Sequence, residues 1–127
     1  MNLLLEIGKI TSGAVTKAAC VVYDAAGKVL LPGAANAVKF AGVAQHDAAN
    51  GATLRLAKAG IVDVVAAAAI APGEELVIAD NAGRVQPAGA VAGTVYNIVG
   101  RAEEVASAAG DIIEMSIAPS SKNSAAS

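Results

Sequence analysis

Few residues in this chain have side chains that could carry out chemistry. Its one histidine, His46, stands next to Asp47 in the stretch FAGVAQHDAANG, and a histidine beside a carboxylate could act as a general base. Adjacent residues point to opposite faces of a strand and do not face each other on a helix, so the pair is not a preassembled relay. We interpret His46 as a partly exposed side chain beside a turn. An enzyme that draws a partner for His46 from elsewhere in the chain is the alternative.

The other reactive residue types also lack the spacing that catalysis or metal binding requires. Cys20 lies in the apolar run AACVVY with no base nearby, and one cysteine with one histidine makes no zinc site. We interpret the adjacent carboxylates Glu74-Glu75 and Glu103-Glu104 as solvated charges. The Gly27-Lys28 pair has Val22 where a phosphate loop needs glycine. We therefore predict no catalytic, cofactor-binding or metal-binding residues, and no enzyme activity.

The composition predicts one domain with a thin core. The 127 residues are enough for a single domain, but alanine is the commonest residue and the only aromatic side chains are Tyr23, Phe40 and Tyr96. Each alanine removes little apolar area from water, so a core of alanine and valine contributes modestly to stability. We expect contacts between subunits to supply part of the stability.

Charge and hydropathy argue against two classes of partner, nucleic acids and membranes. Nine Lys/Arg against eleven Asp/Glu give a net charge of -2 without a basic cluster, so we expect no nucleic acid partner. The longest stretch without charge, residues 85–100, is interrupted by Pro87 and is too short for a membrane-spanning helix, so we expect no membrane partner. The first ten residues do not match a secretory signal. We expect a protein made in the cytoplasm of the producing cell.

Short runs rich in Val, Ile, Leu and Thr alternate with Gly, Pro, Asn and Asp, which predicts an all-β fold, a small antiparallel barrel or sandwich. At most one short helical turn is expected, near Ala66–Ala71. We expect an N-terminal arm and first strand over residues 1–15, a single β domain over 16–119 and a disordered polar tail over 120–127. The predicted strands are Leu3–Lys9, Ala14–Tyr23, Lys28–Leu31, Val38–Gln45, Thr53–Ala57, Ile61–Val65, Glu75–Ala79, Arg84–Gln86, Thr94–Gly100 and Asp111–Ile117.

An internal repeat predicts that the domain consists of two similar β units. The run VVYDAAGKVLLPG, residues 21–33, matches VIADNAGRVQPAG, residues 77–89, and both contain Asp-x-Ala-Gly followed by a basic residue. This is the pattern of a hairpin with glycine at a position of positive φ. A second pair, AGVAQHDAANGATLRL and VGRAEEVASAAGDIIEM, follows in the same order. We predict two units, roughly residues 17–62 and 73–118, related by a pseudo-two-fold.

Three stretches of the chain carry a resemblance to a known family. They are FAGVAQHDAANGATLRLAKAGIVDV, AAIAPGEELVIADNAGRV and NIVGRAEEVASAAGDIIEMSI, each a sequence of strands and glycine turns. The chain resembles the capsid cement, or decoration, proteins of tailed bacteriophages over about residues 16–119. The resemblance implies a structural virion protein on the outer capsid surface, which binds the major capsid protein and bridges its subunits. It also implies a homo-oligomer, with a trimer favoured, and no catalysis.

Two further expectations concern contacts. The apolar opening segment, with Leu3, Leu4, Leu5 and Ile7, could add a strand to the open sheet edge of another chain, so we predict a capsid or subunit interface there. The alternative function is a bacterial β-barrel module that binds a small ligand or a protein partner, which a monomer with an apolar barrel pocket would favour.

Overall fold

The structure, a computed structural model, describes residues 4–89 and 93–123, and within them all regular structure is β. No helix in this part of the chain is long and apolar enough to span a membrane. The strands are β1 (Leu5–Ile10), β2 (Cys20–Tyr23), β3 (Val29–Leu30), β4 (Phe40–Ala44), β5 (Thr53–Ala59), β6 (Ile61–Val65), β7 (Glu75–Ile78), β8 (Val85–Pro87), β9 (Val95–Ala102) and β10 (Ile112–Asn123).

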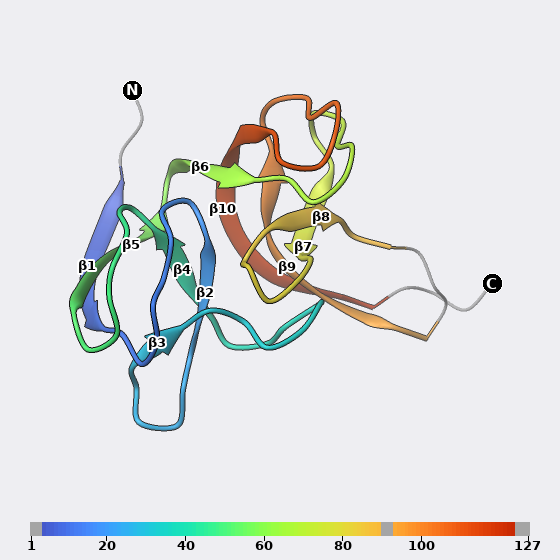
Figure 1. Cartoon of the computed structure of the whole chain (residues 1–127). Coiled ribbons are helices and arrows are strands. Elements are labelled where there is room, and N and C mark those ends of the chain that lie inside the picture. Colours follow the sequence, from blue (N-terminus) through green and yellow to red (C-terminus); the bar gives the residue numbers. More distant parts are fainter. Residues whose placement is uncertain (1–3, 90–92, 124–127) are drawn as a thin grey trace.

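The strands form two five-stranded antiparallel sheets with the same topology. The first has the order β1-β5-β4-β2-β3 and the second the order β6-β10-β9-β7-β8, so β6 to β10 repeat β1 to β5 strand for strand. Figure 1 shows the two units side by side, the first in blue to green and the second in yellow to red. Only Gly60 separates β5 from β6. The prediction of an all-β fold made of two similar units is confirmed.

Each sheet closes on itself into a small barrel. A parallel bridge joins Thr11, just after β1, to Val29 in β3, and the equivalent bridge joins Ala66, just after β6, to Val85 in β8. The two ends of each sheet therefore meet, which leaves fewer free strand edges than a flat sheet would have. Of the two predicted architectures, barrel and sandwich, the structure shows the barrel.

The interiors of the two barrels are filled from the same places in the repeat. Seven buried side chains form the first interior, and each has a buried counterpart in the second. They are Val15, Val21, Val29, Ala41, Ala44, Leu54 and Leu56 in the first barrel, and Ile70, Leu76, Val85, Val99, Ala102, Ile113 and Met115 in the second. The first interior has the smaller side chains. Each interior therefore buries little apolar area, as the composition predicts, and the apolar contact between the two barrels increases the total area buried.

A glycine in each barrel permits a bulge beside the central strand. Gly42 pairs with Val21 and Gly100 pairs with Leu76, and in both cases the register shifts at the next residue pair. A Cβ on Gly42 would lie 2.6 Å from the carbonyl oxygen of Ala57, and a Cβ on Gly100 would overlap the backbone of the next strand. A side chain at either position would force the strands apart.

The repeated hairpin turns have the predicted conformation. Oδ1 of Asp80 accepts hydrogen bonds from the backbone N–H groups of Ala82 at 3.0 Å and Arg84 at 3.4 Å, and Asp24 makes the same two bonds in the first barrel. Gly83 has a φ of 76°. Burial opposes ionisation of Asp80, but hydrogen bonds from the Arg84 side chain and from the turn outweigh it and hold the pKa of Asp80 below its usual value.

Three sequence expectations differ from the structure in detail. Residues 66–71 contain no helical turn; Ala66 and Ile70 instead make bridges, because their backbone groups complete the barrel. The strand β10 runs to Asn123, so the first four residues of the expected tail pair with β9, and residues 124–127 lie outside the described part. The equivalent strands begin at β1 and β6, so the structural repeat is longer than the ranges 17–62 and 73–118. The single-domain organisation stays a prediction.

Candidate functional site

His46 anchors a loop to a strand. Its Nε2 accepts a hydrogen bond from the backbone N–H of Arg55 at 3.1 Å, and its Nδ1 lies 2.9 Å from the carbonyl oxygen of Asp47. In the second barrel Oε1 of Glu104 accepts the equivalent bond, from the N–H of Glu114 at 2.7 Å. An imidazole and a carboxylate can replace each other here because the fold needs only an acceptor. The interpretation of His46 as a side chain beside a turn agrees with this geometry.

Cys20 is a core side chain. It is fully buried at the contact between the two barrels, and burial raises the pKa of its thiol to about 12. The thiol therefore stays protonated at neutral pH, and a protonated thiol is a poor nucleophile.

The adjacent carboxylates are tied to neighbouring turns. Oε1 of Glu74 accepts a hydrogen bond from the N–H of Ala71 at 2.6 Å, and Glu103 accepts one from the hydroxyl of Ser116. Among the residues that the structure describes, no group of three or more His, Cys, Asp or Glu side chains could hold a metal ion. Glu74 and Glu103 thus hydrogen-bond to their own barrel, in agreement with the interpretation of the adjacent carboxylates as non-catalytic charges.

The predicted contact segment at the start of the chain is only partly a surface. Leu4 and Leu5 are 42% and 58% exposed, whereas Ile7 is half-buried and packs on the interior cluster of the first barrel. Leu3 lies outside the described residues. The strand β1 pairs with β5 along its full length, and in the described part of the chain its other edge meets β3 only through the Thr11–Val29 bridge, just beyond the end of β1. The exposed leucines and this edge remain candidates for a contact.

The two barrels pack against each other through apolar surfaces. One buried cluster contains side chains from both barrels: Cys20, Val22, Val43 and Ala57 from the first, and Val62, Val64 and Ile78 from the second. The backbone N–H of Cys20 donates a hydrogen bond of 2.9 Å to the carbonyl oxygen of Gly83, in the β7–β8 turn. This contact was not predicted from the sequence. A usable signal was the uninterrupted run Cys20–Val22, since a strand that is buried on both faces reads as continuously apolar.

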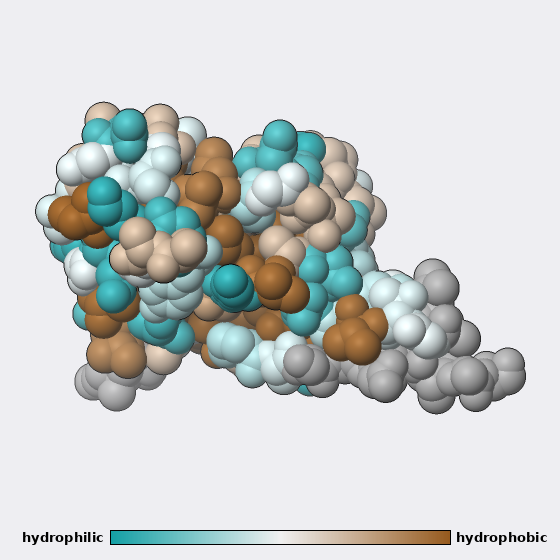
Figure 2. Space-filling model, turned by 90° about the horizontal axis from the view of Figure 1, so that it is seen from below, coloured by the Kyte–Doolittle hydropathy of each residue, from teal (hydrophilic) through white to brown (hydrophobic). Residues whose placement is uncertain are grey.

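A second contact joins the β9–β10 ribbon to the first barrel. The side chain of Asn97 donates a hydrogen bond of 2.9 Å to the carbonyl oxygen of Asn36, and the N–H of Asn97 donates one of 2.8 Å to Oδ1 of Asn36. A hollow lies beside this junction, lined by Val38, Phe40 and Ile98 among others. Figure 2 shows apolar surface running between the two lobes of the molecule. A groove of this kind suits contact with a protein surface.

Comparison with known proteins assigns this two-barrel chain to a family. A family model described as "Phage cement protein" matches residues 5–117, which include all of the first barrel and most of the second. The chain belongs to the phage cement protein family. The match confirms the resemblance seen in the sequence and shows that the chain is a structural protein of the phage capsid.

A solved structure supports the fold of this cement protein. The chain is similar to the head fiber gp8.5 N base of bacteriophage phi29, with 19% sequence identity and a TM-score of 0.64. The similarity covers 91% of this chain and 95% of the phi29 chain. No curated protein matches the chain. The two-barrel arrangement is therefore shared with another protein whose description places it on a phage head.

Proposed function

We propose that this cement protein binds the outer surface of a tailed-phage head and stabilises the capsid by bridging neighbouring major capsid subunits. The observation that supports the proposal is the family match over both barrels. His46, Glu74, Glu103 and Glu104 hydrogen-bond within the barrels and Cys20 is buried between them, which agrees with a protein that acts through surface contact. The protein is made in the host cytoplasm and adds to the outside of the shell, away from the genome, which agrees with its lack of a basic cluster.

The stabilisation follows from mass action. A protein that binds the assembled shell and not the free capsid subunit shifts the equilibrium toward the shell by a free energy that grows with its concentration. A cement protein that touches two capsid subunits must also be released from one of them before the subunits can separate. Neither step requires a catalytic group.

The contact proposed is the exposed start of β1. Leu4 and Leu5 present apolar surface to solvent at the end of β1 away from the bridge to β3, and an exposed apolar strand end suits an edge-to-edge contact with a strand of the capsid protein. Leu3 is included in the proposed contact because it continues the same apolar run in the sequence. Ile7 supports the strand from the barrel side.

Heads purified from a phage that lacks the protein provide the test. Wild-type protein should co-sediment with them in a saturable manner and raise the temperature at which they release DNA. The variant Leu4→Ser/Leu5→Ser should bind more weakly by about thirtyfold, because together the two exposed fractions amount to about one whole leucine, or about 2 kcal/mol.

A matched control separates the segment from exposed apolar surface in general. Val105 and Ile112 are 63% and 65% exposed in the second barrel, and Val105→Ser/Ile112→Ser should bind heads like wild type. Equal loss in both variants would argue against the β1 contact, and no wild-type binding at all would overturn the proposed function. The alternative of a ligand inside a barrel is not favoured, because seven side chains fill each interior.

A further inference from the structure

The contact between the two barrels uses a different surface on each of them. The first barrel contributes a surface that we name the docking face, and the second contributes a surface that we name the receiving face. The docking face consists of Ala19, Cys20, Val22, Val43 and Ala57. The receiving face consists of Val62, Val64, Ile78 and Gly83. Because the two barrels have the same topology, each barrel carries an equivalent of both faces. The contact is therefore heterologous, and it leaves one receiving face and one docking face unused.

The unused receiving face lies on the first barrel and is basic. Strand registers place Lys9 at the position of Val64 and Tyr23 at the position of Ile78. The ammonium groups of Lys9 and Lys58 lie 5.7 and 5.1 Å from the centre of the Tyr23 ring. Lys58 follows Ala57 as Ile117 follows Ser116, and Ile117 packs on the buried cluster. Lys9 and Lys58 thus stand where the covered face has apolar side chains, whereas Ile7, at the position of Val62, is apolar as well.

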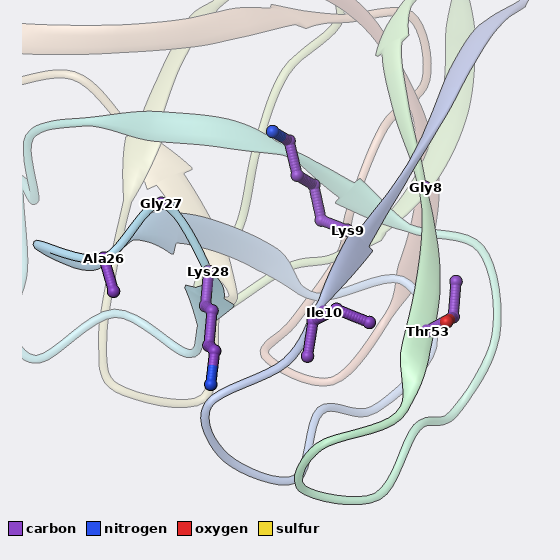
Figure 3. A pocket seen from close by; sticks show the side chains of 7 residues that line it. All are labelled: Gly8, Lys9, Ile10, Ala26, Gly27, Lys28 and Thr53. Atoms are coloured by element: carbon purple, nitrogen blue, oxygen red, sulfur yellow. The ribbon is translucent and has the colours of Figure 1, made fainter.

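The same face is hollow where the covered one is filled. A Cβ on Gly83 would lie 2.6 Å from the carbonyl oxygen of Cys20, whereas a Cβ on Gly27, its counterpart, would meet nothing within 4 Å. A pocket of the first barrel lies here, between β1 and the Asp24–Lys28 turn (Figure 3), with Lys9 and Lys28 on its rim. The place that Ala19 and Cys20 occupy on the second barrel is therefore vacant on the first.

The equivalent of the docking face lies on the second barrel and has a net negative charge, because Glu74 and Glu75 outnumber Arg101, which stands at the position of Val43. Val77, at the position of Val22, is covered by Tyr96 and Ile98 of the same barrel. Glu74 and Glu75 stand at the positions of Ala19 and Cys20, directly before the interior residue Leu76, as Ala19 and Cys20 stand before Val21. Both glutamates are half-buried, and a hollow beside Glu75 is lined by Gly100 and Arg101 among others. The inner pair of faces is apolar on both sides, whereas the outer pair has a net positive charge on one side and a net negative charge on the other.

We propose that copies of this chain associate head to tail, with the receiving face of one copy covering the docking face of the next. Lys9 and Lys28 of one copy then face Glu74 and Glu75 of its neighbour around the hollow beside Gly27, as Gly83 faces Ala19 and Cys20 within the chain. The family resemblance implies a homo-oligomer, and the interface proposed here does not depend on attachment to a head. Opposite charges at the outer faces fix which end meets which.

The test measures mass in solution, without heads, by sedimentation velocity and light scattering. Wild-type protein should sediment as more than one chain, and added salt should dissociate it because salt screens exposed charges. The variants Lys9→Glu/Lys28→Glu and Glu74→Lys/Glu75→Lys should each sediment as single chains. An equimolar mixture of the two should assemble again, since each variant supplies the charge that the other needs.

A control variant excludes a general effect of charge. Lys17→Glu/Arg55→Glu makes the same change in net charge at exposed positions outside both faces, and it should assemble like wild type. Circular dichroism should show that all variants are folded. Wild-type protein that stays a single chain would overturn the proposal, because the charges would then be polar caps on end surfaces. A mixture that fails to assemble would overturn it too. Binding to heads is measured in the separate co-sedimentation experiment, so a negative result for self-association leaves the proposed head binding untouched, and the reverse also holds.

Discussion

The repeat offers a controlled test of the barrel contact through two glycines that share a conformation. Gly27 and Gly83 have φ values of 81° and 76°, and both follow the same Asp-x-Ala sequence. Alanine in this left-handed region costs roughly 1–2 kcal/mol at either position. Only Gly83 touches the other barrel, where a Cβ would lie 2.6 Å from the carbonyl oxygen of Cys20 and 2.9 Å from the Cβ of Ala19.

The expected difference follows from that contact. Relief of the overlap requires the barrels to separate slightly, and overpacking of this kind costs about 1–3 kcal/mol. Loss of the Cys20–Gly83 hydrogen bond adds about 1 kcal/mol. For Gly27→Ala only the backbone strain applies, so we expect it to lower the free energy of unfolding by about 1–2 kcal/mol. For Gly83→Ala the strain, the overpacking and the lost hydrogen bond add up to about 3–6 kcal/mol.

Urea unfolding followed by circular dichroism measures both values. The rate at which a maleimide modifies Cys20 in native protein gives a second readout, because the thiol is covered by the barrel contact. Gly83→Ala should accelerate the labelling and Gly27→Ala should not. Equal destabilisation by the two variants, with equal labelling rates, would refute the account of the contact.

Three further predictions concern single side chains. His46→Ala should lower the free energy of unfolding by about 1 kcal/mol, whereas His46→Glu should restore it, because Glu104 already serves at the equivalent place; urea titration at pH 7 checks both. In the folded wild-type protein Cys20 should resist thiol reagents at pH 8 and react fully in urea, since burial raises its pKa to about 12; rapid labelling without urea would contradict this. Asp80 has a folded-state pKa below the usual 3.8, because bonds from Arg84 and the turn outweigh burial. Its contribution to stability is therefore full above that pH and is lost as the pH falls through the folded-state value. Asp80→Asn should lower the urea concentration at the unfolding midpoint at pH 7. The difference in midpoint between variant and wild type should become smaller in acid, and a difference that stays constant with pH would contradict this.

Local signals in the sequence were enough to predict the strands and the repeat. Alternation around residues such as Leu54 and Leu56 shows which face is buried, and Asp-x-Ala-Gly specifies a hairpin whose glycine needs positive φ. Closure into barrels could not be predicted in this way. It depends on single bridges such as Thr11 to Val29, which join loop residues distant in sequence and leave no periodic pattern.

The contacts outside the barrels were harder still to infer. Val64 and Lys9 occupy equivalent strand positions, and only the neighbouring barrel explains why one is apolar and the other charged. The role of His46 was also hidden, because an acceptor for one backbone N–H can be an imidazole or a carboxylate, and the two have no common sequence signature. Both features depend on which residues the folded chain brings together, and the local sequence does not encode that.

The single-residue connection at Gly60 has a consequence for dilute conditions. It ties the docking face of the first barrel to the receiving face of the second, so that contact forms at an effective local concentration in the millimolar range or above, whatever the amount of protein present. The outer faces have no such tether, and any contact they make depends on how much protein the cell contains. A chain built in this way keeps its barrels paired at low concentration and makes the outer contact only at high concentration.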